Sequence, residues 1–240
     1  MKLYAAALFL SLFPFSIALN GLLSKLRNPT ARFLLILIWP QFGVFVLHAQ
    51  PVPEGFVVWS LASSGFYALR LLTVRDLGLW AGFLASSSLS LLWAGDVANA
   101  FDMHIFALWF SLPSAMLFLL AGAFARRFGA AYAGLYGGLA GSAPRLSGLL
   151  VFTLLAAIAT PPSPGFFAML GLLRGASIAP AVLLIWLLWG WAATRLMQGF
   201  LSGSSECHSV NDIGKGSTLI FACLLGIVVA ASLYLEGRAL

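Results

Sequence analysis

The sequence predicts an all-α, polytopic membrane protein with about eight transmembrane helices, one of which is interrupted by prolines. Of the 240 residues, 61% are hydrophobic and only 8% are charged, whereas about a quarter of the residues in soluble domains are charged. The mean hydropathy is +1.00. The apolar residues also fall into runs of roughly 20, the length that an α-helix needs to cross the hydrocarbon core of a bilayer.

A single transmembrane domain is expected to cover residues 1–240, because every loop between apolar runs is too short to hold a soluble domain. Short loops also place consecutive helices side by side and antiparallel. The first apolar run is expected to be a retained span rather than a cleaved signal. The predicted spans lie near residues 3–19, 32–49, 55–74, 77–95, 103–125, 147–173, 177–199 and 217–235.

Positive charges predict the orientation of these spans, since cytoplasmic loops are rich in Lys and Arg. With the N-terminus outside the cytoplasm and one crossing by residues 147–173, all 13 cations except Lys2, Arg174 and Arg238 face the cytoplasm. If residues 147–173 instead formed a hairpin that returned to its own side, the excess of cations on the cytoplasmic side would be the same. The two halves of that run are each too short to cross alone, which favours a single broken crossing.

Prolines interrupt the run 147–173 in its middle. Pro161, Pro162 and Pro164, followed by Gly165, remove backbone donors and exclude a continuous helix. Non-helical backbone survives at membrane depth only where protein or a water-filled cavity surrounds it, and such breaks recur at the ion and substrate sites of transporters. The pattern favours a transport-related fold. The alternative is two short helices joined by a Pro-rich surface loop.

Titratable residues are missing from the middle of the predicted spans, which contain no Lys, Asp or Glu there. Proton-coupled transport usually needs such groups at depth. The most polar stretch within a span is Ser86, Ser87 and Ser88, which can support close packing or order water in a proton path. At the outer ends, Asp102 and His104 could share a proton. The alternative for this pair is interfacial residues that face water or a partner subunit.

The polar loop 202–216 contains four potential metal ligands, Glu206, Cys207, His208 and Asp212. We favour a solvated loop, because no second ligand cluster accompanies them, and we predict no metal and no cofactor. The cations lie in loops between apolar runs, which indicates membrane orientation and not nucleic-acid binding. No nucleophile and base are paired within the spans, so we expect no catalytic activity of its own. Membrane lipid surrounds the predicted bundle.

Four short segments, in order, resemble the antiporter-like, proton-pumping membrane subunits of respiratory complex I, Mrp antiporters and membrane-bound hydrogenases. They are Arg75-Asp76-Leu77 with the following Phe83-Leu84-Ala85-Ser86-Ser87, then Ala115–Gly122, then Gly137-Gly138-Leu139 with Pro144, and finally Ala159–Phe166. The resemblance covers roughly residues 75–173. It implies a fold similar to the C-terminal half of such a subunit, with its broken helix at Pro161 and a shortened scaffold.

The resemblance also implies a departure at the ion path. The family's His after the serine pair falls on Ser88, its Lys in the next span on Ser114, and its Glu or Lys after the broken helix on Met169. The usual proton-holding side chains are therefore expected to be lost while the scaffold is kept.

Three functions follow as hypotheses. The first is an accessory or structural subunit of a larger proton-coupled complex in a bacterial inner membrane, beside other membrane subunits that include a full-length antiporter-like subunit. The second is an active component of a transporter driven by the proton gradient, for protons, sodium, bicarbonate or CO2. The third is a stand-alone carrier of small solutes.

Overall fold

The computed structural model describes residues 1–47, 51–97, 103–135, 137–203 and 212–239. Within them the chain is helical and has no strand, only an isolated bridge between Asp76 and Tyr132. The predicted all-α class is confirmed. The helices are α1 (Lys2–Phe9), α2 (Ser16–Lys25), α3 (Pro29–Leu47), α4 (Glu54–Leu71), α5 (Leu77–Ser90), α6 (Leu92–Val97), α7 (Met103–Phe128), α8 (Leu139–Ser142), α9 (Pro144–Ala157), α10 (Pro164–Leu173), α11 (Ala179–Leu201) and α12 (Lys215–Ala239).

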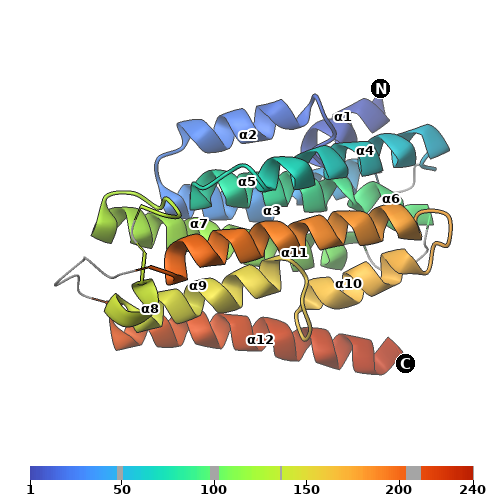
Figure 1. Cartoon of the computed structure of the whole chain (residues 1–240). Helices are drawn as coiled ribbons and strands as arrows, with labels where there is room; N and C mark the ends of the chain where they lie inside the picture. The colour runs from blue at the N-terminus through green and yellow to red at the C-terminus, as the bar shows by residue number, and fades with distance from the viewer. Residues whose placement is uncertain (48–50, 98–102, 136, 204–211, 240) are drawn as a thin grey trace.

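The long helices lie side by side along one axis, and both termini are at the same end of the bundle (Figure 1). Helix α5 occupies the interior, since 94% of an 18-residue stretch within Leu77–Gly95, which includes part of α6, is buried. Helix α12 lies at the edge beside α9 and α10 (Figure 1), and only 6% of an 18-residue stretch within Lys215–Tyr234 is buried. The Gly, Ala and Ser residues of α5 explain its central place, because small side chains let neighbouring helices approach closely.

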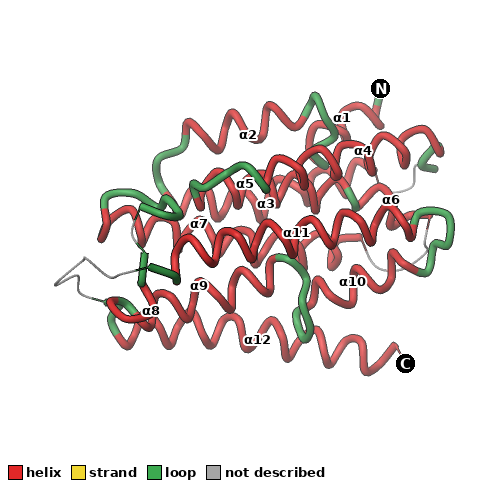
Figure 2. The backbone as a smooth tube through the Cα atoms, in the orientation of Figure 1, coloured by secondary structure: helices red, strands yellow, loops and turns green. Residues whose placement is uncertain are grey.

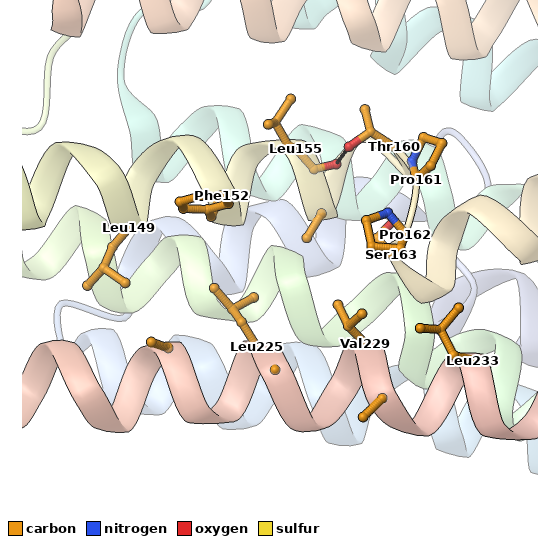
Figure 3. Close-up of a pocket in the computed structure, with 14 residues that line it drawn as sticks. Leu149, Phe152, Leu155, Thr160, Pro161, Pro162, Ser163, Leu225, Val229 and Leu233 are labelled. Atoms are coloured by element: carbon orange, nitrogen blue, oxygen red, sulfur yellow. Dashed lines mark hydrogen bonds between the residues drawn. The ribbon is translucent and has the colours of Figure 1, made fainter.

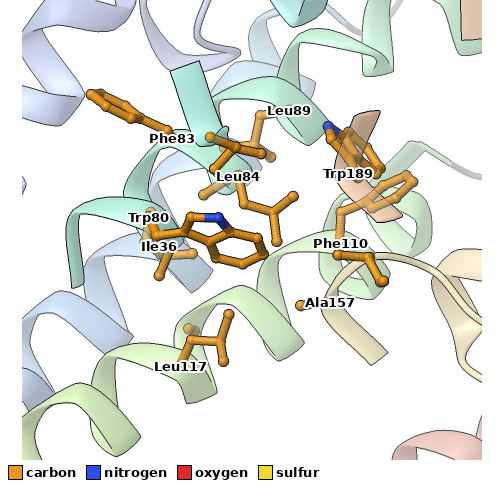
Figure 4. Close-up of a cluster of buried hydrophobic side chains, with 14 of the residues drawn as sticks. Ile36, Trp80, Phe83, Leu84, Leu89, Phe110, Leu117, Ala157 and Trp189 are labelled. Atoms are coloured by element: carbon orange, nitrogen blue, oxygen red, sulfur yellow. The ribbon is translucent and has the colours of Figure 1, made fainter. Parts of the chain in front are cut away.

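Large buried side chains from separate helices fill the interior (Figure 4). Trp80 of α5 lies near Ile36 of α3, and Phe110 of α7 packs edge-on against Trp189 of α11 with ring centroids 6.0 Å apart. In a bilayer the lipid tails are as apolar as these side chains, so close packing and polar contacts hold the helices together.

Five helical segments are long and apolar enough to cross a bilayer, counting only the described residues. Helix α4 and the shorter pairs α1–α2 and α9–α10 have a place in the bundle but fall outside those criteria, so the total of about eight spans stays a prediction. The five segments are Pro29–Leu47, Leu77–Gly95, Met103–Phe128, Ala179–Leu201 and Lys215–Tyr234.

The broken segment crosses the bundle once. Helix α9 ends at Ala157 and α10 begins at Pro164. The two helices follow one another along the bundle, and the chain leaves α10 at the end opposite to the one where it enters α9 (Figure 1). The loop between them is visible in Figure 2. The count of positive charges does not distinguish this path from a hairpin. The directions of α9 and α10 do, because α10 continues along the bundle and does not turn back (Figure 1).

The first predicted span, 3–19, is wrong as a continuous helix. A loop at residues 10–15 separates α1 from α2, which extends to Lys25 (Figure 2). Ser11 has a φ of 55° and Pro14 has no backbone donor, so neither fits an uninterrupted helix. Hydropathy alone misses the break because all but one of the intervening residues are apolar.

Candidate functional site

The serines of α5 form the centre of a buried polar cluster. Ser86, Ser87 and Ser90 are all fully buried. Because α5 is surrounded by other helices, these hydroxyls can only bond to neighbouring helices or to their own helix. Ser90 Oγ lies 2.9 Å from the carbonyl oxygen of Ser11 and 2.8 Å from that of Ser86. One hydroxyl carries one proton, so Ser90 shares it between the α1–α2 loop and α5.

One arm of this cluster runs towards α2 and α4. Asn20 Nδ2 donates to Ser86 Oγ at 2.9 Å and to the carbonyl oxygen of Ser16 at 3.1 Å. The hydroxyl of Ser16 lies 2.6 Å from that of Tyr67. Four residues from three helices are thereby connected inside the bundle, with the link between Asn20 and Ser16 passing through the Ser16 backbone carbonyl.

A second arm runs towards α4 and α11. Ser87 Oγ donates to the carbonyl oxygen of Ser64 at 2.8 Å and lies 3.0 Å from Ser64 Oγ. It accepts a hydrogen bond from Trp189 Nε1 at 2.9 Å. We call the two arms, together with Ser90 and the Ser11 carbonyl group that it contacts, the hydroxyl network. Its members are Ser11, Ser16, Asn20, Ser64, Tyr67, Ser86, Ser87, Ser90 and Trp189.

The buried side chains of the described residues include no Asp, Glu, Lys, Arg or His. The buried polar groups are hydroxyls of Ser and Thr, together with Tyr67 and the indole groups of tryptophans. A neutral hydroxyl both donates and accepts, so the network can orient hydrogen bonds. It holds no fixed charge, in contrast to the ionisable residues that mark ion paths in other membrane proteins.

The three positions that the family resemblance assigns to titratable side chains lie outside the hydroxyl network. Ser88 Oγ turns back to the carbonyl oxygen of Ala85 in its own helix at 3.1 Å. Ser114 is buried beside the helix-bending Pro113, and its hydroxyl has no hydrogen-bond partner. Met169 is completely buried in α10. Of the predicted serines, Ser86 and Ser87 therefore join the network, while Ser88 and Ser114 do not.

Side chains satisfy the backbone at the break between α9 and α10. Thr160 Oγ1 donates to the carbonyl oxygen of Leu155 at 2.9 Å (Figure 3), and Trp186 Nε1 donates to that of Ile158 at 2.9 Å. The Leu155 carbonyl also accepts the backbone N–H of Thr160 at 3.1 Å, and the tryptophan pairs the Ile158 carbonyl just after α9, where an unpaired carbonyl is costly in a bilayer. The prolines break the helix, and a threonine and a tryptophan stabilise the broken form.

A cavity of about 500 Å³ lies between α9, the break and α12 (Figure 3). Apolar side chains such as Phe152, Leu225 and Val229 line most of it, and residues 160–163 form the wall at the break. The Thr160 hydroxyl is engaged with the α9 backbone. The cavity beside the proline break, where the sequence predicts a transport site, is therefore lined mainly by apolar surface. Gly165 is not one of the described residues that line this cavity. A Cβ added to it would be 3.1 Å from Ala159 Cβ.

The α1–α2 loop is held by α4 in a comparable way. The backbone N–H of Phe13 donates to Ser63 Oγ at 3.1 Å, and its carbonyl oxygen accepts from Trp59 Nε1 at 2.6 Å. The sequence analysis missed this second break and its polar partners. Pro14 within an apolar run was the available signal.

Asp102 lies outside the described residues, so the predicted Asp102–His104 pair remains a prediction. His104 is the second residue of α7, and its Nδ1 lies 2.9 Å from Gln41 Oε1 of α3. Gln41 Nε2 also donates to the His104 carbonyl oxygen at 3.4 Å. His104 thus joins α3 to α7, through a glutamine that the sequence analysis did not select.

Glu206, Cys207 and His208 of the polar loop also lie outside the described residues. Asp212 is described, and its carboxylate accepts hydrogen bonds from the backbone N–H groups of Arg145 at 2.8 Å and Leu146 at 3.1 Å. These are first-turn donors of α9, so Asp212 caps that helix from a distant loop. Among the described residues, no cluster of His, Cys, Asp and Glu is arranged to hold a metal.

The fold defines a multi-pass helical membrane protein that contains a helix broken at prolines. Residues 82–196 match the family described as NADH:quinone oxidoreductase/Mrp antiporter, transmembrane. This part of the chain is therefore similar to the antiporter-like membrane subunits of complex I and Mrp antiporters, which the sequence motifs also resemble. No curated protein matches the sequence.

Two solved structures share the fold. A chain of respiratory complex I from Thermus thermophilus, solved with bound NADH, superposes with a TM-score of 0.78 at 22% identity, over 93% of this chain and 52% of that one. A chain of the Mrp complex from Dietzia sp. DQ12-45-1b gives a TM-score of 0.82 at 17% identity, over 99% of this chain and 56% of that one. The chain thus spans about half the length of the solved chains it matches.

Proposed function

We propose that this protein is an accessory, structural membrane subunit of a larger proton-coupled complex that translocates ions. The observation that carries the proposal is the uncharged interior. The described buried residues contain hydroxyl and indole groups but no Asp, Glu, Lys, Arg or His. A path that stores and releases protons needs groups whose charge changes near neutral pH, and hydroxyls do not provide it.

The hydroxyl network supports the same proposal. Its groups are paired across helices, for example Ser16 with Tyr67 and Ser87 with Trp189. Interhelical hydrogen bonds of this kind stabilise helix association in lipid. Ser88, Ser114 and Met169 stand where we assign the family's proton-holding residues, and we propose that this exchange leaves a scaffold without its own ion path.

We propose that the partners are other membrane subunits, including a full-length antiporter-like subunit, in the inner membrane of a bacterium. Support comes from the relatives, which are named as parts of complex I and of an Mrp complex. Helix α12 is hardly buried within the chain, and α11 exposes Leu184, Leu187 and Trp191. Such apolar faces fit lipid or a neighbouring subunit. We assign the N-terminus to the outside, from the positive charges.

The test is replacement of Ser88, Ser114 and Met169 by Ala in the native complex, one at a time and together. We expect the complex to assemble and ion translocation to stay at the wild-type rate, because no charge carrier is removed. Co-purification followed by mass spectrometry identifies the partners and checks assembly. Loss of translocation in a fully assembled variant would contradict the proposal.

Direct contacts between hydroxyl groups, such as Ser16 with Tyr67 and Ser64 with Ser87, favour one second candidate, an active component of a transporter driven by the proton gradient. In that case protons would pass along hydroxyls and reach the outer Asp102 and His104, and the cargo would be protons, sodium, bicarbonate or CO2. Proteoliposomes of the native complex would then lose flux in Asp102→Asn and His104→Gln variants. Unchanged flux would remove this candidate. Transport by the isolated chain would instead point to a stand-alone solute carrier.

A further inference from the structure

A second cavity, of about 610 Å³, opens at the end of the bundle where α2 ends and α3 and α5 begin. Its lining includes three arginines from three parts of the chain. Arg27 lies in the connection between α2 and α3, Arg32 in the first turns of α3, and Arg126 near the end of α7. This end of the bundle is the one we predict to face the cytoplasm.

The positive charge of this cavity is not neutralised within it. Among the described residues that line it, the only carboxylate is that of Asp76, and Asp76 Oδ1 accepts the backbone N–H of Leu79 at 2.7 Å as the cap of α5. The described lining therefore contains three arginines and one carboxylate, and that carboxylate also caps a helix. Guanidinium groups bind phosphate with paired hydrogen bonds and lose less hydration than ammonium groups when they do so.

Arg32 is held in place before any ligand binds. Its Nε donates to the carbonyl oxygen of Leu26 at 2.6 Å, and its guanidinium carbon lies 5.8 Å from the centre of the Phe118 ring. Its Nη1 lies beside Gly78, where an added Cβ would be 3.2 Å away. A guanidinium fixed in this way loses little side-chain entropy on binding, so it suits the inner side of a binding site.

The remaining wall of the cavity is apolar. Phe118, Ala121 and Ala125 of α7 line it, and the ring of Pro29 lies against Gly122, where a larger residue has no room. A cationic rim above an apolar wall matches a phosphate group attached to a hydrocarbon chain. Basic pockets between transmembrane helices on the cytoplasmic side bind the head groups of anionic lipids.

We propose that this cavity binds a phosphate group, with Arg27, Arg32 and Arg126 as its ligands. The shared chemistry is the phosphate anion, carried by an anionic phospholipid or free in solution. In the lipid case Phe118 and Ala121 contact the glycerol and the first methylenes. This binding site is independent of the proposed accessory function, because it requires neither proton transfer nor a partner subunit.

The experiment uses the purified, delipidated full chain in detergent and native mass spectrometry. Phosphatidylglycerol is titrated, with phosphatidylcholine of the same acyl chains in parallel. The wild type should prefer phosphatidylglycerol. In the double variant Arg27→Gln/Arg126→Gln its Kd should rise about 25-fold, at about fivefold per arginine. Arg70→Gln is the matched control, because Arg70 lies over the Phe83 ring and outside the cavity. Its Kd should not change.

Inorganic phosphate at millimolar concentration distinguishes the two sources. Displacement of phosphatidylglycerol by phosphate supports recognition of the anion itself, whereas lipid binding that resists phosphate supports a phospholipid as the ligand. The proposal is overturned if the wild type binds both lipids equally, if the double variant binds like the wild type, or if Arg70→Gln weakens binding as much. The melting temperature checks folding, and the single variant Arg126→Gln replaces the double variant if the latter unfolds.

Discussion

The hydroxyl oxygens of Ser16 and Tyr67 lie 2.6 Å apart and join α2 to α4 inside the bundle. Both side chains are buried, at 0% and 3% exposed. Because α2 follows a break and is only ten residues long, it depends on such contacts to keep its place against α4 and α5.

Tyr67→Phe should lower the stability of the protein without changing its fold. The substitution removes one hydroxyl and leaves that of Ser16 without this partner, which costs about 0.5–2 kcal/mol, since interhelical hydrogen bonds in bilayers average only about 0.6 kcal/mol. Thermal unfolding in detergent measures the loss. Tyr132→Phe is the control, because Tyr132 is 44% exposed. Equal melting temperatures for both variants would show that the Ser16 contact contributes nothing.

Ser87→Ala and Ser88→Ala should differ although the residues are neighbours. Ser87 accepts from Trp189 Nε1 and donates to Ser64, so its loss leaves a buried indole N–H unpaired and should cost about 1–3 kcal/mol. Ser88 only bonds to its own helix at Ala85, and its replacement should be close to neutral. Urea unfolding of both variants tests this difference. A larger loss for Ser88→Ala would contradict the described hydrogen bonds.

Gly122→Ala should impair folding, because an added Cβ would overlap the ring of Pro29 where α3 meets α7. Overpacking of this kind costs about 1–3 kcal/mol. Gly148→Ala is the matched control within α9, since nothing lies within 4 Å of its added Cβ. It should stabilise the protein by up to about 1 kcal/mol, because alanine favours the helix. The yield of folded protein and the melting temperature report both effects.

Asp212→Ala should loosen the start of α9. The variant removes the acceptor for the backbone N–H groups of Arg145 and Leu146, at a cost of about 0.5–2 kcal/mol. Asp212→Asn should retain part of the stability, since asparagine keeps one acceptor oxygen for the two backbone N–H groups that the two oxygens of Asp212 accept. Hydrogen exchange of the first turn of α9 is the measurement. Faster exchange in the Asn variant than in the Ala variant would count against a capping role.

The break at Pro161 could be predicted because prolines act locally, through a missing N–H and a clash with the preceding turn. The break at Pro14 was missed, since a single proline in an apolar run is compatible with a bent helix. Trp59 and Ser63 of α4, which are far from this break in the sequence, form hydrogen bonds with the backbone of Phe13 in the loop. The serines of α5 were selected for their polarity, yet only the fold separates Ser87, which bonds across helices, from Ser88, which does not.

The amino-acid sequence by itself determined that this protein is a helical membrane protein with a helix broken at prolines. The thickness of a bilayer sets the length of an apolar run, and the cluster Pro161, Pro162 and Pro164 excludes a continuous helix, although single prolines such as Pro113 lie within one. The tertiary structure decided which way α10 continues, which hydroxyls are paired, and that Asp212 caps α9. Those outcomes depend on groups from helices far apart in the chain meeting within about 3 Å, a coincidence that no local pattern of residues encodes.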